Sequence, residues 1–186
     1  MARRAVILAE RGFQDEELIY SYYRLQEAGW YVNVASPTGD IVHGKFGVPA
    51  RVDRAIEDLE VNNYDAVILP GGFEAPDRLR MRRDVQSFVR DMCEGGKLVA
   101  AICHGPWILI SAGICKGRTL AGYDSIRPDI ENAGGKYSHA AVVTDGNLIT
   151  APHYRNNGDF MKAVIDWKSP EETWGLELCG AAAANM

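Results

Sequence analysis

The chain has 186 residues and a formal net charge of −5; 47% of its residues are hydrophobic and 24% are charged. This composition is typical of one globular domain large enough to bury a core. The acidic balance argues against nucleic acid or an anionic membrane surface as a main partner, and no apolar run reaches the roughly 18 residues of a membrane span.

Cysteine usage and the N-terminus indicate a cytoplasmic protein with free thiols. Only a short apolar run follows Met1, too short for the core of a signal peptide. The four cysteines show no CxxC spacing and the four histidines show no zinc-binding spacing, so we expect neither disulfides nor a metal. A GxGxxG motif and a P-loop are both missing, so no organic cofactor is expected.

Apolar runs of strand length alternate with segments of helical spacing. Residues 5–9 (AVILA) are too few for a helix and suit a buried strand. Helical spacing then runs from residue 15 to Gly29, a natural helix stop. Further along, we predict strands at 30–35, 65–69 and 97–102, loop and short strand at 41–52, a loop at 70–77, helices at 83–93, 107–112, 126–133 and 159–167, and a hairpin of 141–144 with 147–150.

The strands are continuously apolar, which predicts a mostly parallel sheet covered on both faces. The expected fold is therefore a three-layer α/β sandwich in one domain, residues 1–168. The tail, 169–186, has no clear period, so it is either disordered or packed on a partner. Ligands of such folds bind at the carboxyl ends of the strands, here the breaks at 10–17, 70–77 and 103–106.

Cys103 follows the predicted strand 97–102 and has small residues two places to either side, Ala101 and Gly105. A nucleophile elbow needs this arrangement, because the sharp strand-to-helix turn strains the central residue and excludes bulky neighbours. The turn is expected to expose the sulfur at a helix N-terminus, which lowers the pKa of a thiol. Simple burial or surface exposure is the alternative, and we expect it for the other three cysteines.

Backbone N–H groups near Cys103 could hold a developing oxyanion. The N–H of His104 follows the nucleophile, the usual place for one donor, and Gly71 or Gly72 at the end of the neighbouring strand could supply the other. Pro-Gly-Gly is also a common turn. The His104 side chain is not assigned as a base by adjacency alone, because neighbouring side chains on a turn often point apart.

Three segments, AICHGPWILISAG, VILPGG and GFQDEELIYSYYRLQEAG, resemble the signature blocks of the PfpI-type intracellular cysteine peptidases. These belong to the superfamily of the Parkinson's-disease-associated deglycase, and the resemblance covers residues 4–167. It implies a class I glutamine amidotransferase-like fold, which is flavodoxin-like. Members are described as peptidases, glutathione-independent glyoxalases, protein deglycases, isocyanide hydratases, chaperones and oxidative-stress sensors.

The resemblance assigns roles to individual positions. It places the family cysteine on Cys103, the adjacent histidine on His104, and the glutamate that hydrogen-bonds the cysteine on Glu17. Glu17 could then donate to the thiolate and shuttle a proton, whereas taken alone it reads as a solvated carboxylate at a helix N-terminus. The aromatic or histidine position over the cysteine falls on Tyr123. We expect the substrate-binding pocket to be lined by Tyr123, Gly71, His153 and Glu74.

Several positions depart from the family pattern. The residue three places before Glu17 is usually acidic and is Gln14 here. PfpI-type peptidases complete a triad with the glutamate of an Ala-Pro-Glu segment from a neighbouring subunit; this chain has Asp77 there, and Glu74 just before it could approach instead. An SRxP element is replaced by residues 151–155, so His153 is either a second imidazole over the pocket or an exposed loop residue.

We prefer a cysteine-dependent enzyme that acts on small carbonyl compounds, a glyoxalase or protein deglycase, with Cys103 as nucleophile. The first alternative is a peptidase that uses Cys103, His104 and Asp77 of a neighbouring subunit. The second is an oxidative-stress sensor or chaperone, with a Cys103 sulfinate held by Glu17. The resemblance implies a homo-oligomer, a dimer or hexamer. The first helix gives an independent indication of this, because one face of a helix cannot bury all three of its tyrosines, Tyr20, Tyr22 and Tyr23.

Overall fold

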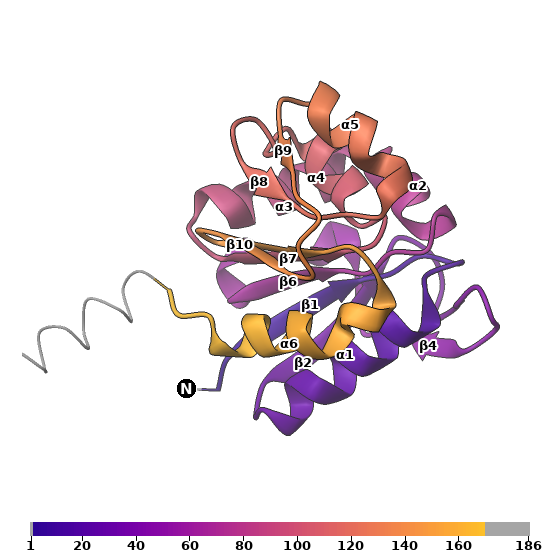
Figure 1. Cartoon of the computed structure of the whole chain (residues 1–186). Helices are drawn as coiled ribbons and strands as arrows, with labels where there is room; N and C mark the ends of the chain where they lie inside the picture. Colours follow the sequence, from indigo (N-terminus) through magenta and orange to yellow (C-terminus); the bar gives the residue numbers. More distant parts are fainter. Residues whose placement is uncertain (1, 170–186) are drawn as a thin grey trace, which may run out of the picture.

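The computed structural model describes residues 2–169 and shows a central sheet between two layers of helices (Figure 1). The main sheet has the order β10-β11-β7-β6-β1-β2-β5, and every neighbouring pair is parallel except β10 with β11. Its strands are β1 (Arg4–Leu8), β2 (Tyr31–Ser36), β5 (Arg54–Ala55), β6 (Ala66–Leu69), β7 (Leu98–Ile102), β10 (Val143–Asp145) and β11 (Leu148–Ala151). Two small sheets pair β3 (Ile41–His43) with β4 (Pro49–Arg51) and β8 (Thr119–Leu120) with β9 (Lys136–Tyr137).

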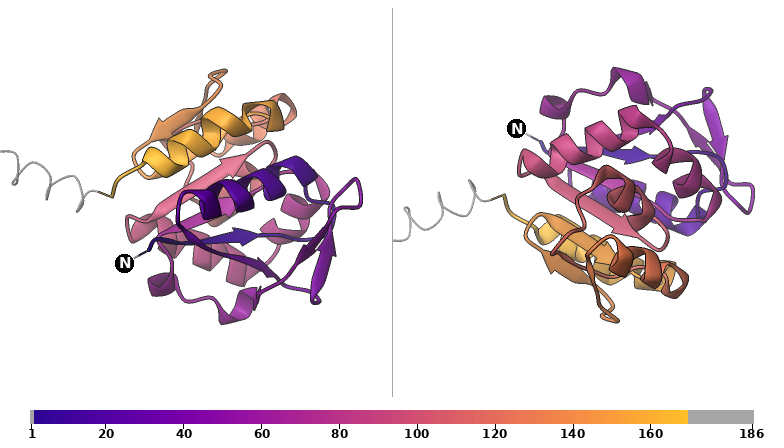
Figure 2. Two further views of the ribbon diagram at one scale, coloured as in Figure 1. Left: turned by 90° about the horizontal axis from the view of Figure 1, so that it is seen from below. Right: turned by 90° about the horizontal axis from the view of Figure 1, so that it is seen from above.

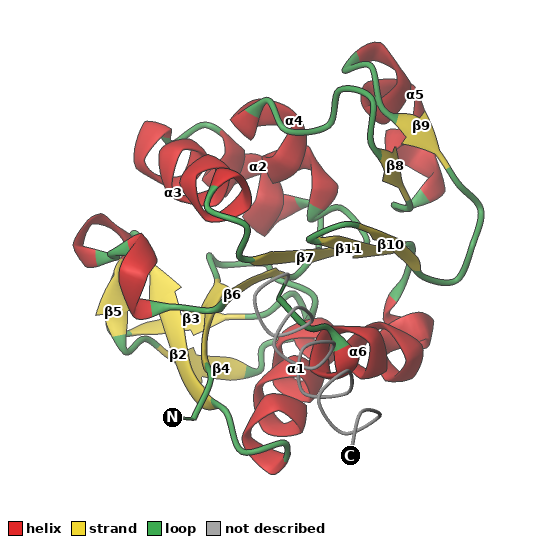
Figure 3. Cartoon of the chain, turned by 90° about the vertical axis from the view of Figure 1, so that its left-hand side faces the viewer, coloured by secondary structure: helices red, strands yellow, loops and turns green. Residues whose placement is uncertain are grey.

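Helices cover both faces of the main sheet (Figure 3). One layer holds α1 (Asp15–Glu27) and α6 (Asn157–Asp166), which lie side by side (Figure 2). The other layer holds α2 (Glu74–Arg80), α3 (Arg83–Glu94), α4 (Pro106–Ala112) and α5 (Arg127–Asn132). Each face buries its own apolar cluster, one around Phe13 and Phe160 and the other around Phe88 and Met92. The predicted three-layer sandwich is confirmed.

Most predicted elements lie within a few residues of their observed positions, but α2 was not predicted. Residues 70–77 were expected to form a loop, and Glu74 instead begins a helix. Pro76 lies in the first turn of that helix, where its missing N–H has no intrahelical acceptor to lose. The expected tail lies outside the described residues, apart from Ser169. None of the described helices is long and apolar enough to cross a membrane.

The strands β1, β6 and β7 lie next to one another and run in the same direction. Their carboxyl ends therefore meet at one edge of the sheet, and the segments that follow them share that edge. A hydrogen bond from the Gln14 N–H to the Gly71 carbonyl joins the first two of these segments. This edge positions the candidate site, as expected for a parallel sheet.

Candidate active site

Cys103 occupies a strained turn between β7 and α4. Among residues 2–169 it is the only non-glycine residue with a positive φ, +61°. A side chain at Gly105 would collide with the backbone oxygens of Leu69 and Ile102, so glycine is required there. Pro106 then begins α4 with a φ suited to the first turn of a helix. The predicted nucleophile elbow is therefore present.

Three groups surround the Cys103 sulfur. The Nδ1 atom of His104 lies 3.3 Å from Sγ, so the two neighbouring side chains meet, which adjacency in the sequence had left open. The backbone N–H groups of Gly72 and His104 lie near enough to the sulfur to lower the pKa of the thiol. These are the two donors that the sequence suggested for an oxyanion, and they converge on the nucleophile.

Glu17 reaches this site from the first turn of α1. Its side chain is fully buried, and Oε2 accepts a 2.5 Å hydrogen bond from the Gly71 N–H. A Cβ on Gly71 would lie 2.6 Å from Cys103 Cβ and 2.9 Å from Glu17 Oε2, so only glycine allows this contact. Burial raises the pKa of Glu17 to about 8. Glu17 is thus a neutral carboxyl at pH 7 and not a solvated helix-terminal carboxylate.

The expected exposure and lowered pKa of the Cys103 thiol are both wrong. Cys103 is 6% exposed, and burial raises the pKa of its thiol to about 12. Glu17, once ionised, adds to this rise, while the N–H groups of Gly72 and His104 oppose it. Desolvation outweighs the amides because the sulfur lies among buried groups. The resting site therefore holds a thiol beside a neutral carboxyl.

Aromatic rings stack on the outer side of His104. The Tyr123 ring lies 4.9 Å from the His104 ring at an interplanar angle of 24°, and the Tyr123 N–H donates to the Cys103 carbonyl. His153 is half-buried and stacks on Tyr123 at 5.9 Å, with its Nδ1 accepting from the Arg155 N–H. His153 thus approaches the site through Tyr123 and is not simply an exposed loop residue.

Comparison with known proteins identifies the family of this chain. Residues 3–167 match the model of the DJ-1/PfpI family. The chain belongs to the DJ-1/PfpI family. The deglycase PfpI of Pyrococcus furiosus is 42% identical over 150 residues, which cover 81% of this chain and 90% of that protein.

Two further relatives show the range of the family. YraA of Bacillus subtilis, named as a candidate cysteine protease, is 38% identical over 152 residues, which cover 81% of this chain and 89% of that protein. The crystal structure of Drosophila melanogaster DJ-1beta superposes with a TM-score of 0.84 at 29% identity, covering 89% of this chain and 90% of that chain. Those names describe the relatives, and they do not specify the reaction of this DJ-1/PfpI protein.

The two acidic residues of α2 lie apart from the nucleophile of this DJ-1/PfpI protein. Glu74 pairs with Arg11 at 2.9 Å and with Arg78 at 3.0 Å, and these contacts lower the pKa of its carboxyl. Asp77 lines a surface cavity of about 500 Å³ beside Trp107. Within residues 2–169 neither carboxylate hydrogen-bonds to the cysteine or its neighbouring histidine.

Two residues near the site carried no signal in the sequence. Ser125 places its Oγ 3.3 Å from Nε2 of His104. Lys45 lies on the β3–β4 turn, where Asp15 accepts the N–H groups of Phe46 and Val48. Burial and the positive charge of Lys45 both lower the pKa of His104. Neither belongs to a motif. Each lies on a turn that approaches the site only in the folded chain, so its position could not be predicted from the sequence.

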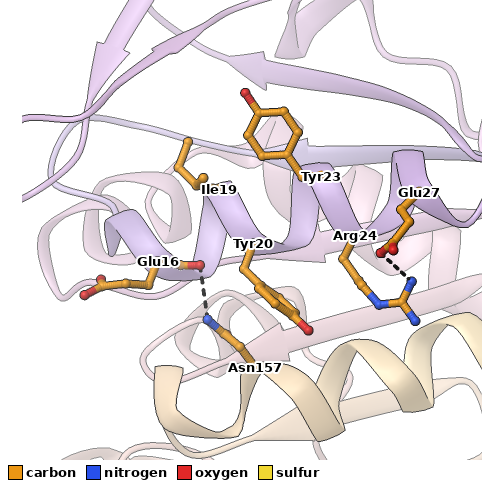
Figure 4. A pocket seen from close by; sticks show the side chains of 7 residues that line it. All are labelled: Glu16, Ile19, Tyr20, Tyr23, Arg24, Glu27 and Asn157. Carbon is orange, nitrogen blue, oxygen red and sulfur yellow. Dashed lines mark hydrogen bonds and ion pairs between the residues drawn. The ribbon is translucent and has the colours of Figure 1, made fainter.

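A second hollow, of about 550 Å³, lies on the outer side of α1 beside α6 (Figure 4). Its lining comes from one face of α1 and from Asn157, and the residues around Cys103 take no part in it. Tyr20 and Tyr23 project into solvent there and are 39% and 62% exposed. Among the described residues, no group of three or more His, Cys, Asp or Glu side chains could hold a metal.

Proposed function

We propose that this protein is a cysteine-dependent enzyme acting on small carbonyl compounds, as a glutathione-independent glyoxalase or protein deglycase. The observation that carries this proposal is the buried Glu17 carboxyl, which the Gly71 N–H holds beside Cys103 within one chain and whose pKa burial raises to about 8. A carboxyl that carries a proton at neutral pH suits a reaction in which a thiol adds to a carbonyl and protons then move between adjacent carbons.

In the first step the Cys103 sulfur attacks the aldehyde carbon of a 2-oxoaldehyde. The thiol proton passes to Nδ1 of His104, 3.3 Å away, as the S–C bond forms. The former carbonyl oxygen becomes an oxyanion close to the sulfur, within reach of the N–H groups of Gly72 and His104. A thiol with a raised pKa is compatible with this step, because the base removes its proton during the attack.

In the second step His104 returns its proton to the oxyanion and then takes the proton that leaves the former aldehyde carbon, while Glu17 protonates the oxygen of the neighbouring carbonyl. His104 next delivers its proton to the neighbouring carbon, and the hydroxyl of the former aldehyde carbon gives its proton back to Glu17. One carbon is oxidised and its neighbour is reduced, so no external oxidant or reductant is needed. The product is a thioester of a 2-hydroxy acid, which water hydrolyses to the free acid and the Cys103 thiol. In a deglycase the sulfur displaces an amine from the same carbon, and the amine leaves with the thiol proton.

The peptidase alternative is favoured by the name of YraA and by the short distance from Cys103 to His104. It also needs a carboxylate to orient His104, and Asp77 of a neighbouring subunit would have to reach an imidazole nitrogen that already faces Ser125. The sensor alternative requires a readily oxidised thiolate, which the burial and raised pKa of Cys103 disfavour.

The test compares the wild type with Cys103→Ser and with Cys93→Ser, a control at a half-buried cysteine on α3. Each protein is incubated with methylglyoxal, with a methylglyoxal-treated N-acetyl amino acid and with a fluorogenic peptide. We expect turnover of a carbonyl substrate that Cys103→Ser abolishes and Cys93→Ser retains. Hydrolysis of the peptide alone would overturn the proposal, and equal carbonyl turnover by all three proteins would remove Cys103 as the nucleophile.

We also propose that the protein forms a homo-oligomer, a dimer or a hexamer. The support is the exposure of Tyr20 and Tyr23 on the face of α1 that borders the second hollow. Sedimentation velocity of the wild type and of Tyr23→Glu measures this directly. A wild-type chain that sediments as a monomer at micromolar concentration would contradict the proposal.

A further inference from the structure

The imidazole of His104 has a polar partner at each ring nitrogen. Nδ1 lies 3.3 Å from Cys103 Sγ, and Nε2 lies 3.3 Å from Ser125 Oγ. The ring is also held by the stacked Tyr123 ring and by the edge of Trp107, whose centroid is 5.0 Å away. With one face stacked on Tyr123, an edge-type contact to Trp107 and both nitrogens engaged, the ring has a defined orientation toward the sulfur.

We infer that Ser125 is the positioning residue for His104, so that the relay from Cys103 through His104 to Ser125 is complete within one chain. This inference rests on the proposed function, in which His104 receives the thiol proton. It differs from a triad closed by a carboxylate of a neighbouring subunit, because the nitrogen that such a carboxylate would bind already faces a hydroxyl.

A hydroxyl suits this position for a chemical reason. When Nε2–H donates to Ser125 Oγ, the Nδ1 lone pair faces the thiol and can accept its proton. Once Nδ1 is protonated, Nε2–H still donates to the same oxygen, so the ring keeps its place during the transfer. A serine carries no charge, so it does not hold His104 as an imidazolium in the resting enzyme, as a carboxylate would.

The charged and titratable groups around His104 agree with a neutral resting base. Burial and the positive charge of Lys45 both lower the pKa of His104. Glu17, on the other side of the sulfur, is neutral below a pKa of about 8. The nearest carboxylate on the turn that carries Ser125 is Asp124, and it accepts a 2.9 Å hydrogen bond from the Tyr137 hydroxyl. The hydroxyl of Ser125 is thus the group that this turn offers to His104.

The test uses Ser125→Ala, Ser125→Thr and Ser125→Asp, with Ser87→Ala as the matched control at an exposed serine on α3. Two quantities are measured for each protein. One is kcat and KM for the carbonyl substrate. The other is the rate at which iodoacetamide alkylates Cys103 as a function of pH, followed by peptide mass spectrometry so that the other cysteines are counted separately.

We expect Ser125→Ala to lower kcat about three- to tenfold with KM unchanged, which is the effect of losing one neutral hydrogen bond. Alkylation should slow by a similar factor at neutral pH, and the difference from the wild type should shrink as the pH rises toward about 10, where hydroxide removes the thiol proton without His104. Ser125→Thr keeps the hydroxyl and should restore both quantities, and Ser87→Ala should match the wild type. Ser125→Asp should move the alkylation profile to lower pH, because an anion raises the pKa of His104.

Wild-type kinetics and a wild-type alkylation profile in Ser125→Ala would overturn the inference. An alkylation rate that does not approach the wild-type rate as the pH rises toward about 10, or a loss that Ser125→Thr does not restore, would also overturn it, because either result indicates a general disturbance of the turn. If the wild type converts no carbonyl substrate, the proposed function fails. The alkylation profile still decides the role of Ser125 in that case, since it needs no substrate.

Discussion

The carboxyl oxygen Oε2 of Glu17 accepts a 2.5 Å hydrogen bond from the backbone N–H of Gly71, a residue 54 positions later in the chain. This bond ties α1 to the turn after β6 and holds the carboxyl beside Cys103. Within residues 2–169 the other oxygen, Oε1, is buried without a hydrogen-bond partner of its own. A carboxyl with one satisfied and one free buried oxygen is suited to hold a proton on the free oxygen.

Replacing Glu17 with glutamine should remove the proton carrier while keeping the shape of the side chain. We expect Glu17→Gln to lower kcat for a carbonyl substrate by about 100-fold or more, the range of a positioned general acid or base, with little change in KM. Steady-state kinetics measures this. Glu16→Gln, at the exposed neighbour on α1, is the control, and a Glu17→Gln enzyme as active as that control would exclude proton transfer by Glu17.

Glu17 should also make the stability of the protein depend on pH. Its pKa is about 8 in the folded protein and 4.5 as the reference value, so between these limits the folded state holds a proton that the unfolded state has lost. The free energy of unfolding of the wild type, relative to Glu17→Gln, should therefore be greatest below pH 4.5. It should fall by at most about 5 kcal/mol as the pH rises to 8 and beyond.

Urea denaturation of both proteins between pH 5 and pH 9 measures that difference. The comparison with Glu17→Gln cancels the contribution of groups that titrate in both proteins. A difference that stays constant over this range would show that the pKa of Glu17 is not raised in the folded protein.

Gly71→Ala should disturb the site at its most crowded point. The added methyl would lie 2.6 Å from Cys103 Cβ and 2.8 Å from the His104 nitrogen, so the elbow or the Gly71 turn must move. We expect a loss of about 1–3 kcal/mol in the free energy of unfolding and loss of most activity. Gly158→Ala is the control, because a Cβ there meets nothing within 4 Å. Thermal or urea unfolding and an activity assay of the two variants provide the comparison, and equal behaviour would contradict the packing argument.

Substitutions of Asp77 distinguish the carbonyl-enzyme proposal from the peptidase alternative. In a carbonyl enzyme with its proton carriers in one chain, Asp77→Asn should change turnover by no more than about twofold, as expected for a surface substitution. A peptidase with a shared triad should instead lose peptide hydrolysis in Asp77→Asn and gain it in Asp77→Glu, because the longer side chain restores the expected reach. Assays of both activities on both variants distinguish the cases, and a peptide-specific loss would favour the peptidase.

The fold was predictable because the signals that define it are local. Apolar runs such as 5–9 and 97–102 marked strands, and glycines such as Gly29 marked helix ends. The helix α2 was missed because its first turn contains Pro76 and follows two glycines, a composition that also suits a loop. The helix α2 packs against α4 and α3, and local composition does not reveal these contacts.

At the site, the elbow could be predicted from local sequence, because the residues that permit a strained turn at Cys103 are its near neighbours Ala101 and Gly105. The raised pKa of Glu17, the direction of the His104 ring and the approach of Ser125 could not be predicted in this way. Each of these depends on desolvation or on contacts between loops that are distant in the chain. The same burial reversed the expected pKa shift of Cys103, because a helix terminus is a local feature, whereas removal from water is a property of the whole fold.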